Sequence, residues 1–312
     1  MVILTEEQID NGPVDWHSTI DVIATTVRCL ETGEFVQPIK PYLRYGDLRN
    51  RIIAMPAFVG GAVEMAGIKW IASFPGNIQK GLPRAHSVVI LNEAGTGVPV
   101  AIISTALLSV IRTASVSGYV IRCFDDWKKA RDIEIGVVGY GPIGQYHVKM
   151  CRALLGDRIR RLRVFDIRGV RTDFPDADEG IEVVDSWQEA YEGADIFITC
   201  TVADAPYIDR RPKDSSLHLN VSLRDYKTDV YEWFKDTMIV DSWEEVCREN
   251  TDIERMHLGK GLTREDTRSI VDMANGRCFE TYRPASPVLF NPMGMAVFDI
   301  AMASHYYRKY SF

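Results

Sequence analysis

The sequence predicts an α/β protein of two domains, one built on a doubly wound parallel sheet and one an α+β domain with a mainly antiparallel sheet. The first observation is length, since 312 residues suit two domains of roughly 100–200 residues each. Short apolar runs bounded by turn residues fill the first third of the chain, which is typical of antiparallel strands. From Ile133 onward, apolar runs alternate with helical segments, and this alternation predicts parallel strands.

The first domain is expected to begin with a strand at Val2–Leu4 and a helix that ends near Gly33. The helix is predicted by four apolar residues at helical spacing: Ile20, Ile23, Val27 and Leu30. Four apolar runs predict the antiparallel strands: Arg51–Met55, Met65–Phe74, Ser87–Leu91 and Val98–Ser104. The turn-rich stretch Asn92–Gly97 between the last two predicts a hairpin.

A long buried helix over Thr105–Phe124 follows, and the polar stretch Asp125–Asp132 is expected to lead into the second domain. The parallel strands are predicted at Ile133–Val138, Leu162–Phe165, Ile181–Val184, Asp195–Cys200, Leu217–Val221 and Met238–Val240. The final stretch, Val288–Phe312, predicts a strand and a helix that return to the first domain. We therefore expect residues 1–124 and 286–312 to form one domain and residues 125–285 the other.

Composition argues against several classes of function. The chain has 36 lysines and arginines against 43 acidic residues, a formal net charge of −7, and so lacks the basic field of nucleic-acid binding proteins. An acidic N-terminal stretch and the shortness of the longest apolar run, Val98–Ile111, argue against a signal peptide and a membrane span. We expect a cytoplasmic protein. The six cysteines form no C-x-x-C pair and the histidines no H-E-x-x-H, so no metal site is expected.

The strongest local motif is Gly139-Tyr-Gly-Pro-Ile-Gly144, which follows an apolar strand and opens a helix. In this context G-x-G-x-x-G predicts a Rossmann-type dinucleotide-binding turn. Gly139 would permit the tight turn, Gly141 the approach of a pyrophosphate, and Gly144 close packing of helix on strand. Pro142 and Ile143 open the helix whose N-terminus would bind the pyrophosphate.

An acidic residue at the end of the second parallel strand bears on the choice of cofactor. Asp166 lies 22 residues after Gly144, where a carboxylate accepts both ribose hydroxyls and repels a 2′-phosphate. NAD is therefore expected as the cofactor. Arg168 leaves NADP open, because a nearby arginine can bind that phosphate.

Polar residues at the carboxyl ends of later strands would face the nicotinamide ring. The residues in these places are Thr199, Cys200, Thr201, Asn220 and Ser222. For Cys200 the alternative is a small packing residue, because no partner base accompanies it at a fixed spacing. Asp225 follows the second of these strands and is a candidate acid/base, with a turn or capping aspartate as the alternative.

Cationic side chains in the first domain are candidates for binding an anionic substrate. Lys69 lies inside an apolar strand, and a buried ammonium without a partner is costly, although Lys69 alternatively faces water while Ile68 and Trp70 face the core. Arg112 interrupts an apolar helix, where a solvated face is the alternative. Arg44 and Arg84 follow proline-containing segments, and each taken alone is as well explained by a surface position.

Four motifs together resemble the ornithine cyclodeaminase/mu-crystallin family over almost the whole chain. They are GIKWIASFPGN at Gly67–Asn77, IRTASVS at Ile111–Ser117, the glycine fingerprint, and FNPMGMA at Phe290–Ala296. Other stretches look closest to the family's branch of N-((2S)-2-amino-2-carboxyethyl)-L-glutamate dehydrogenases of siderophore-precursor biosynthesis: Phe35–Arg44, Arg51–Pro56, Thr199–Ile208 and Leu289–Ala296.

This resemblance implies an activity and partners. The activity is NAD-dependent oxidation and hydrolysis of that glutamate derivative to L-2,3-diaminopropionate, 2-oxoglutarate and NADH. The first domain would bind substrate and form a homodimer through its sheet. A pyridoxal-phosphate synthase of the same pathway would join O-phosphoserine to glutamate and supply the substrate.

The resemblance also implies roles for single residues. Lys69 matches the family lysine beside the substrate carboxylate and nicotinamide, and Asp225 matches the catalytic acid/base. Arg44 and Arg112 match carboxylate-binding arginines; Arg84 is added because the substrate has three carboxylates. Gly294 is placed with the cofactor-binding residues.

Other functions stay open on the sequence alone. One is ornithine cyclodeamination or another amino-acid or ketimine dehydrogenase activity. Ile53 disfavours the cyclodeaminase, because it stands where ornithine cyclodeaminases have a glutamate. Another is a non-catalytic, crystallin-type nucleotide-binding protein, which the joint retention of Lys69, Arg112 and Asp225 disfavours.

Overall fold

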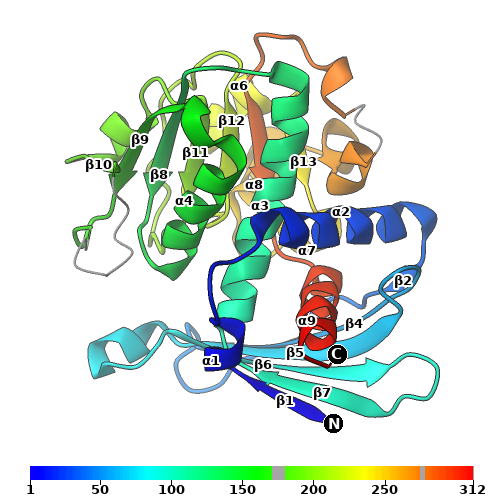
Figure 1. The fold of residues 1–312 in the computed structure, drawn as a ribbon. Helices are drawn as coiled ribbons and strands as arrows, with labels where there is room; N and C mark the ends of the chain where they lie inside the picture. Colours follow the sequence, from blue (N-terminus) through cyan, green and yellow to red (C-terminus); the bar gives the residue numbers. More distant parts are fainter. Residues whose placement is uncertain (171–179, 275–277, 312) are drawn as a thin grey trace. The chain divides into compact units, whose positions relative to one another are not determined.

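The computed structural model describes residues 1–170, 180–274 and 278–311. The chain divides into two compact units, Met1–Val116 with Gly294–Phe312, and Ser117–Met293. Figure 1 labels their helices and strands. One unit has a mixed, mostly antiparallel sheet and the other an all-parallel sheet, so the predicted α/β fold class is confirmed.

The sheet of the first unit runs in the order β1-β7-β6-β5-β4-β2, with β3 also paired to β4. Its strands are β1 (Val2–Thr5), β2 (Phe35–Val36), β3 (Tyr42–Leu43), β4 (Arg51–Val59), β5 (Met65–Ser73), β6 (Ala85–Glu93) and β7 (Pro99–Ser104). The pairs are antiparallel except that β1 lies parallel to β7. The predicted hairpin joins β6 to β7.

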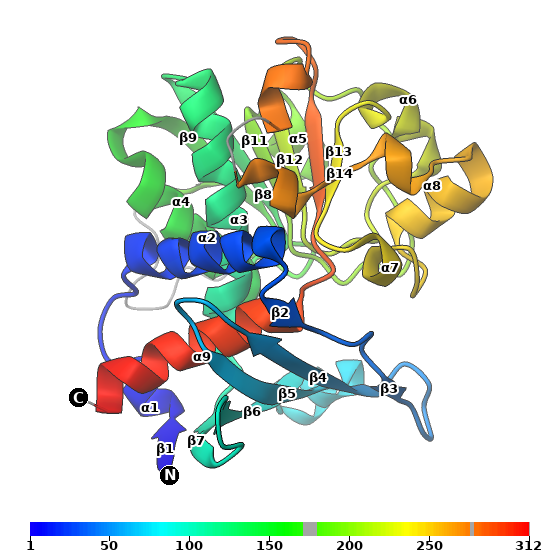
Figure 2. The same ribbon diagram turned by 90° about the vertical axis from the view of Figure 1, so that its right-hand side faces the viewer.

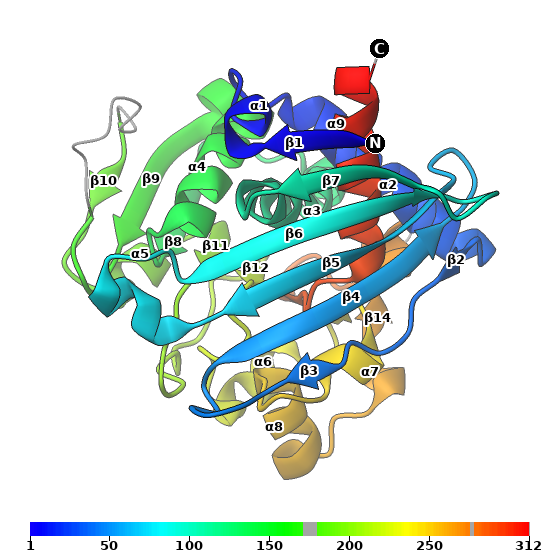
Figure 3. The same cartoon turned by 90° about the horizontal axis from the view of Figure 1, so that it is seen from below.

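Strand alternation gives this sheet one buried face and one partly exposed face. A buried row crosses five paired strands: Leu4, Ile103, Val89, Lys69 and Met55. Helix α9 (Ala296–Ser311) packs on β4, β5 and β6, and Figure 3 shows it behind the sheet. The opposite row, on the partly exposed face, is apolar throughout: Ile3, Ile102, Ile90, Ile68 and Pro56.

The remaining helical segments of the first unit are α1 (Glu6–Ile9), α2 (Trp16–Thr32) and the 3-10 turn η1 (Pro75–Lys80). The Asp15 carboxylate caps α2 by accepting from the Ser18 amide, and Gly33 ends it in the left-handed conformation, as the sequence predicts. Figures 1 and 2 both show α2 beside α9. This layer of helices covers the buried face of the sheet.

Helix α3 (Leu107–Lys128) belongs to both units, with its residues up to Val116 in the first. It continues past the predicted end at Phe124, so the polar stretch from Asp125 starts as helix. By length and composition α3 could cross a membrane, but 67% of its most apolar stretch is buried inside the protein. Its apolar side chains therefore serve as core.

The sheet of the second unit is parallel throughout, in the order β10-β9-β8-β11-β12-β15-β13-β14. The strands are β8 (Ile133–Val138), β9 (Ile159–Phe165), β10 (Glu182–Val183), β11 (Ile196–Thr199), β12 (Leu217–Asn220), β13 (Met238–Val240), β14 (Arg268–Ser269) and β15 (Val288–Asn291). The strand order reverses between β8 and β11, which is where doubly wound sheets bind ligands.

The strand predicted from Val288 lies in the middle of this parallel sheet, between β12 and β13. All four of its residues are buried, as expected for a strand covered on both faces. The chain therefore stays in the second unit up to Met293, beyond the boundary placed at 285/286. At the other passage the units divide within α3, before the boundary placed at 124/125.

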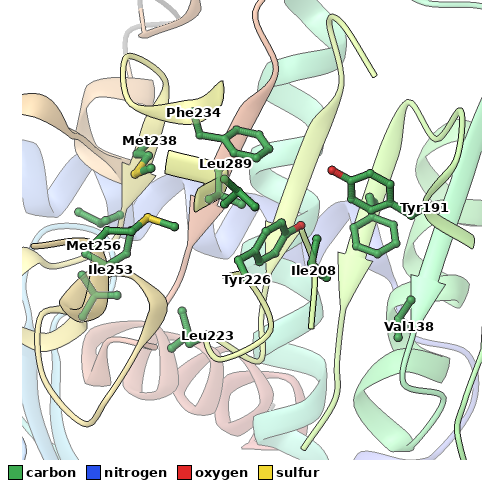
Figure 4. Packing of buried hydrophobic residues seen from close by; sticks show 14 of the residues in the cluster. Val138, Tyr191, Ile208, Leu223, Tyr226, Phe234, Met238, Ile253, Met256 and Leu289 are labelled. Carbon is green, nitrogen blue, oxygen red and sulfur yellow. The ribbon is translucent and has the colours of Figure 1, made fainter. Parts of the chain in front are cut away.

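The helices of the second unit are α4 (Pro142–Leu155), α5 (Trp187–Tyr191), α6 (Tyr231–Phe234), α7 (Trp243–Val246) and α8 (Asp252–Lys260). Short 3-10 turns are η2 (Gly156–Arg158), η3 (Thr228–Val230), η4 (Arg264–Asp266), η5 (Ile270–Met273) and η6 (Cys278–Thr281). Figure 4 shows part of the apolar cluster that packs α5, α6, α7 and α8 on the sheet. Leu223 and Tyr226 belong to this cluster, so the core anchors the segment that follows β12.

Candidate functional site

The glycine-rich turn joins β8 to α4 at the carboxyl edge of the parallel sheet. Gly139 has φ 92°, and a Cβ there would lie 2.6 Å from the carbonyl of Cys200. A Cβ at Gly144 would lie 2.0 Å from the Gly139 carbonyl oxygen, whereas one at Gly141 would meet no atom within 4 Å. Two glycines are thus required by the turn itself, and the third leaves open space over the helix N-terminus.

The first turn of α4 begins at Pro142, with Gly141 as its N-cap. Ile143 is 36% exposed on that turn. The free amides of this N-terminus carry the positive end of the helix dipole, which suits an anionic group such as a pyrophosphate.

Asp166 follows β9, and its carboxylate contacts the glycine-rich turn. Its carboxylate accepts hydrogen bonds from the backbone amides of Tyr140 (2.7 Å) and Arg168 (2.9 Å). The Arg168 guanidinium is largely exposed and lies 3.9 Å away. Each carboxylate oxygen has a second lone pair, so this geometry leaves acceptors for hydroxyl donors while fixing the carboxylate in place.

The predicted strand-end residues lie on adjacent strands, since Thr199 is paired with both Val138 and Asn220. The Thr199 hydroxyl donates to the Asn220 Oδ1 (3.2 Å), and its oxygen lies 2.9 Å from the Ser222 hydroxyl oxygen. Cys200 has its Sγ 3.8 Å from the Nδ1 of His147, and burial raises the pKa of its thiol well above the ordinary value. A thiol kept protonated in this way is a packing group and not a nucleophile.

Asp225 lies in the segment 220–226, here called the carboxylate loop. Its side chain is fully buried and accepts from the hydroxyls of Thr201 and Ser222. Burial raises the pKa of the Asp225 carboxyl, and hydrogen bonds from Ser222, Thr201 and Thr199 together with the charge of Arg224 oppose that rise without cancelling it. A buried carboxyl with a raised pKa is suited to take up and release a proton.

The buried carboxylate of Asp252, which sequence reasoning missed, fixes the carboxylate loop. Its Oδ2 accepts from the backbone amides of Asp225 and Tyr226 and from the Nδ2 of Asn220, each at 3.0 Å. Asn220 Oδ1 in turn accepts from the amide of Leu223, a residue in the left-handed region at φ 66°. Burial raises the pKa of Asp252 to about 7. No local motif signals Asp252, because its partners lie about 30 residues earlier.

In the first unit, Lys69 and Arg112 meet on one carboxylate. Lys69 Nζ and Arg112 Nε lie 2.8 Å and 2.7 Å from the same oxygen, the Oδ1 of Asp299 on α9. The three side chains come from β5, α3 and α9, and all are buried. Lys69 faces the buried side of its sheet, while Ile68 and Trp70 face the other side. The alternative in which Lys69 faces water and its two neighbours face the core is therefore wrong.

The charges in this group act on one another. Burial lowers the pKa of Lys69 to about 7, against the opposing attraction of Asp299. Burial alone would raise the pKa of Asp299, but the charges of Arg112 and Lys69 outweigh it and hold that pKa below its ordinary value. Asp299 is therefore a fixed negative charge, and Lys69 is poised near neutral pH.

A further lysine that sequence reasoning missed completes what we call the cation cluster: Lys40, Lys69, Arg112 and Asp299. Lys40 is 3% exposed, and its Nζ donates to the carbonyl of Gly294 (2.7 Å). Gly294 itself lies at φ 87°, where a Cβ would be 3.2 Å from the Arg112 guanidinium. Ser109 accepts from Lys69 Nζ (3.1 Å). The cluster brings three cations to one anion.

Arg44 and Arg84 occupy different places. Arg44 is exposed after β3, where its guanidinium donates to the Leu48 carbonyl (2.7 Å) and lies over the Tyr42 ring. Arg84 is half-buried just before β6. Val89 is the β6 residue paired with Lys69, and the strand between it and Arg84 is about 16 Å long. The structure thus joins Lys40 and Arg112 to Lys69, and Gly294 lies beside Lys40 and Arg112 in the first unit.

Across residues 1–170, 180–274 and 278–311, no group of three or more histidine, cysteine, aspartate or glutamate side chains could hold a metal ion. The second unit holds the glycine-rich turn and the buried carboxyl of Asp225, and the first unit holds the buried cation cluster.

Comparison with known proteins agrees with this geometry. Residues 2–311 match the model of the ornithine cyclodeaminase/mu-crystallin family. The chain is 32% identical to the N-((2S)-2-amino-2-carboxyethyl)-L-glutamate dehydrogenase of Staphylococcus aureus, over 93% of this chain and 89% of that protein. It is 26% identical to the alanine dehydrogenase of Archaeoglobus fulgidus, over 99% of this chain and 94% of that protein.

Solved structures share the fold over nearly the whole chain. The Δ(1)-pyrroline-2-carboxylate reductase of Thermococcus litoralis, in complex with NADH and L-proline, superposes with a TM-score of 0.84 at 21% identity, covering 99% of this chain and 97% of that one. An archaeal alanine dehydrogenase dimer with bound NAD gives a TM-score of 0.81 at 20% identity, covering 99% and 95%.

Proposed function

The chain belongs to the ornithine cyclodeaminase/mu-crystallin family of NAD(P)-dependent oxidoreductases, and we propose that it oxidises N-((2S)-2-amino-2-carboxyethyl)-L-glutamate with NAD. The products are L-2,3-diaminopropionate, 2-oxoglutarate and NADH. The observation that carries the proposal is the cation cluster, in which the buried cations Lys69 and Arg112 share the one carboxylate of Asp299, an excess of positive charge that suits an acidic substrate. The 32% identity to the dehydrogenase of that name supports this particular substrate.

The residues of the second unit fit a dinucleotide cofactor. The space at Gly141 and the helix N-terminus at Pro142 would hold a pyrophosphate, and Asp166 would accept ribose hydroxyls, which favours NAD over NADP. The first turn of α4 presents Ile143 beside this site, while Thr199, Thr201 and Ser222 line the ends of adjacent strands. When bound, NAD accepts a hydride, which this protein's side chains cannot do.

In the first unit, Lys69, Arg112 and Lys40 would bind and orient substrate carboxylates. Their charge–carboxylate hydrogen bonds are strengthened by burial, so the substrate would be held in one orientation. Lys40 takes the part that the sequence resemblance gave to Arg44. Ile53 lies on the Lys69 side of β4, so an apolar side chain stands where a second ammonium, as in ornithine, would need a carboxylate.

Asp225 would act as the general acid and base of the reaction. Loss of a hydride from the glutamate Cα and of the N–H proton converts the secondary amine to a ketimine. Asp225 takes a proton from the water that attacks the ketimine carbon, and returns one to the nitrogen as the C–N bond of the carbinolamine breaks. Its buried carboxyl, hydrogen-bonded to Thr201 and Ser222, is suited to both steps.

A panel of substrates tests the proposal: the glutamate derivative, ornithine, alanine and proline, each with NAD and with NADP. We expect rising absorbance at 340 nm only with the glutamate derivative and NAD, and diaminopropionate with 2-oxoglutarate by mass spectrometry. Formation of proline from ornithine without net NADH would instead make the protein a cyclodeaminase. Absence of turnover together with tight NAD binding would favour the non-catalytic alternative.

We further propose a homodimer formed through the partly exposed face of the antiparallel sheet. The apolar row Ile3, Ile102, Ile90, Ile68 and Pro56 crosses this face, and Trp70 beside it is 44% exposed. Such a continuous apolar face is typical of a protein interface. We expect the mass of a dimer by light scattering, and that of a monomer for Trp70→Glu; a monomeric wild-type protein would contradict this.

The setting of the reaction follows from the same proposal. The substrate would come from a pyridoxal-phosphate enzyme that joins O-phosphoserine to glutamate, and both steps would take place in the cytoplasm. Co-expression of the two enzymes should convert O-phosphoserine and glutamate to diaminopropionate, and accumulation of the intermediate alone would count against the pairing.

A further inference from the structure

Asp299, the acidic member of the cation cluster, has no role in the reaction described above. It lies on α9, far in sequence from β5 and α3, and is 1% exposed. Burying a charged carboxylate is costly, so its presence under two substrate-binding candidates calls for a physical reason.

Both cations share one oxygen of this carboxylate. Lys69 Nζ and Arg112 Nε each lie within 2.8 Å of Oδ1, so the two nitrogens are no further apart than these two short contacts allow. Without the negative charge between them, two like charges at this separation in a buried site would repel each other. Asp299 thus holds the ammonium and the guanidinium side by side.

The second carboxylate oxygen of Asp299, Oδ2, shows that this side chain does not hold backbone amides in place. In the part of the chain that the structure describes, Asp299 Oδ2 is buried without a hydrogen-bond partner. Asp252 differs, because its Oδ2 is used by two backbone amides and one side-chain amide. Within the described residues, the Asp299 carboxylate thus pairs with the two cations Lys69 and Arg112.

We propose that Asp299 is a positioning residue, whose carboxylate keeps Lys69 charged and aligned with Arg112 so that together they bind one substrate carboxylate. This inference rests on the proposed function for the identity of the substrate, but not for the alignment itself. One anion against Lys69 and Arg112 leaves excess positive charge for the ligand. Asp299 therefore sets the geometry without cancelling the charge that attracts the substrate.

The groups facing Lys69 make the test specific. They are Asp299 from α9, Arg112 and Ser109 from α3, and Lys40 from the segment before β3. Asp299 is the group that favours the ammonium form, since burial and the two other cations disfavour it. Asp299→Asn keeps the shape and one acceptor but removes the charge, so the Lys69 ammonium should lose its proton at lower pH.

The matched control is Glu134→Gln in the second unit. Glu134 also joins two cations through its carboxylate, Arg160 and Arg163, but at the start of β8, the end of the strand opposite the glycine-rich turn. A variant that acts only through general loss of an ion pair should therefore behave like Glu134→Gln. Asp299→Glu retains the charge with a longer side chain, and distinguishes loss of charge from loss of shape.

Two readouts test the proposal in the full-length protein. In the first, the protein carries lysine labelled with ¹³C at Cε, and NMR follows the lysine signals over a series of pH values; the signal missing from Lys69→Met gives the midpoint for Lys69. We expect a midpoint near pH 7 in the wild type, a lower one in Asp299→Asn, and the wild-type value in Glu134→Gln and Asp299→Glu. An unchanged midpoint in Asp299→Asn, or an equal shift in Glu134→Gln, would overturn the proposal.

The second readout is turnover of the glutamate derivative. For Asp299→Asn we expect kcat/KM to fall about 100-fold, mainly through KM, because misaligned cations bind the carboxylate poorly. A fall confined to kcat, or no fall at all, would contradict the positioning role. If the wild type turns over none of the substrates, the proposed function fails while the NMR midpoints of Lys69 still decide the role of Asp299.

Discussion

The two units each bury a carboxylate at a candidate functional position, and the surroundings of the two carboxylates are opposite. Asp299 lies between two cations, and their charges hold its pKa below the ordinary value. Asp225 lies between two hydroxyls, and burial raises its pKa. The same side chain thus becomes a fixed charge in one unit and a proton carrier in the other, because neighbouring charge stabilises the anion far more than neutral donors do.

The largest effect is expected from removing the proton carrier. Asp225→Asn keeps the hydrogen bonds of an acceptor oxygen but cannot take a proton, so kcat should fall about 10²–10⁴-fold while NAD binding stays unchanged. Steady-state kinetics and titration of NADH fluorescence measure the two quantities. Asp209→Asn, an exposed residue paired with Lys227, is the control. Retained turnover in Asp225→Asn would remove the acid/base assignment.

Two glycine substitutions compare the backbones that support the two regions. Gly139→Ala puts a Cβ 2.6 Å from the Cys200 carbonyl at φ 92°, so it should destabilise the fold by more than about 1–3 kcal/mol and abolish NAD binding. Gly294→Ala, at φ 87°, meets only the end of the Arg112 side chain, so it should cost about 1–2 kcal/mol and raise KM. Urea unfolding and kinetics distinguish them, and equal effects on NAD binding would contradict the comparison.

Asp252 and Lys69 should make contributions of opposite sign to the pH dependence of stability. The pKa of Asp252 is raised to about 7 in the fold, so between pH 4 and 7 its contribution to stability falls as pH rises, while burial lowers the pKa of His147 to about 4 and of His218 to about 3, so their contributions rise with pH up to about 6.5. The pKa of Lys69 is lowered to about 7, so from there to its ordinary value near 10.5 the unfolded state holds more protons and stability rises with pH.

Each slope approaches about 1.4 kcal/mol per pH unit at most. Urea unfolding over this pH range should show that stability rises more steeply with pH on the acid side in Asp252→Asn than in the wild type, and less steeply on the alkaline side in Lys69→Met. A change in the alkaline-side slope in Asp252→Asn, or in the acid-side slope in Lys69→Met, would contradict these assignments.

The smallest effect is expected from Asp166, on the preference for NAD over NADP. Asp166→Ser removes a carboxylate that would repel a 2′-phosphate, and its largely exposed neighbour Arg168 remains to bind one. We expect the preference for NAD over NADP to drop roughly tenfold, which is the size of one partly screened charge–charge contact. The ratio of kcat/KM for the two cofactors measures this, and an unchanged ratio would show that Asp166 does not select the cofactor.

The two regions also differ in how far the sequence predicts them. The glycine turn, Asp166 and the strand-end residues are contiguous with the strands that carry them, so local pattern predicts their common edge. The cation cluster depends on α9 packing against β5, a contact between distant parts of the chain. Sequence reasoning therefore found Lys69 and Arg112 but not Asp299 or the buried Lys40, while the role given to the exposed Arg44 stays a prediction.

The same limit explains the course of the final strand. Four apolar residues at Val288–Asn291 predict a buried strand, but not which sheet receives it. Its place between β12 and β13 depends on pairing with residues about 50 to 70 positions earlier, which no local pattern encodes. Asp252 was missed for the same reason, since its role follows from the loop it supports and not from its neighbours in sequence.

One isotope experiment tests the central claim most directly. The substrate N-((2S)-2-amino-2-carboxyethyl)-L-glutamate, labelled with deuterium at the glutamate Cα, is incubated with the protein and NAD. We expect diaminopropionate, 2-oxoglutarate and NADH in equal amounts, with the deuterium in the NADH. Absorbance at 340 nm and mass spectrometry measure these products. Deuterium retained in unreacted substrate, with product formed from ornithine or alanine instead, would contradict it.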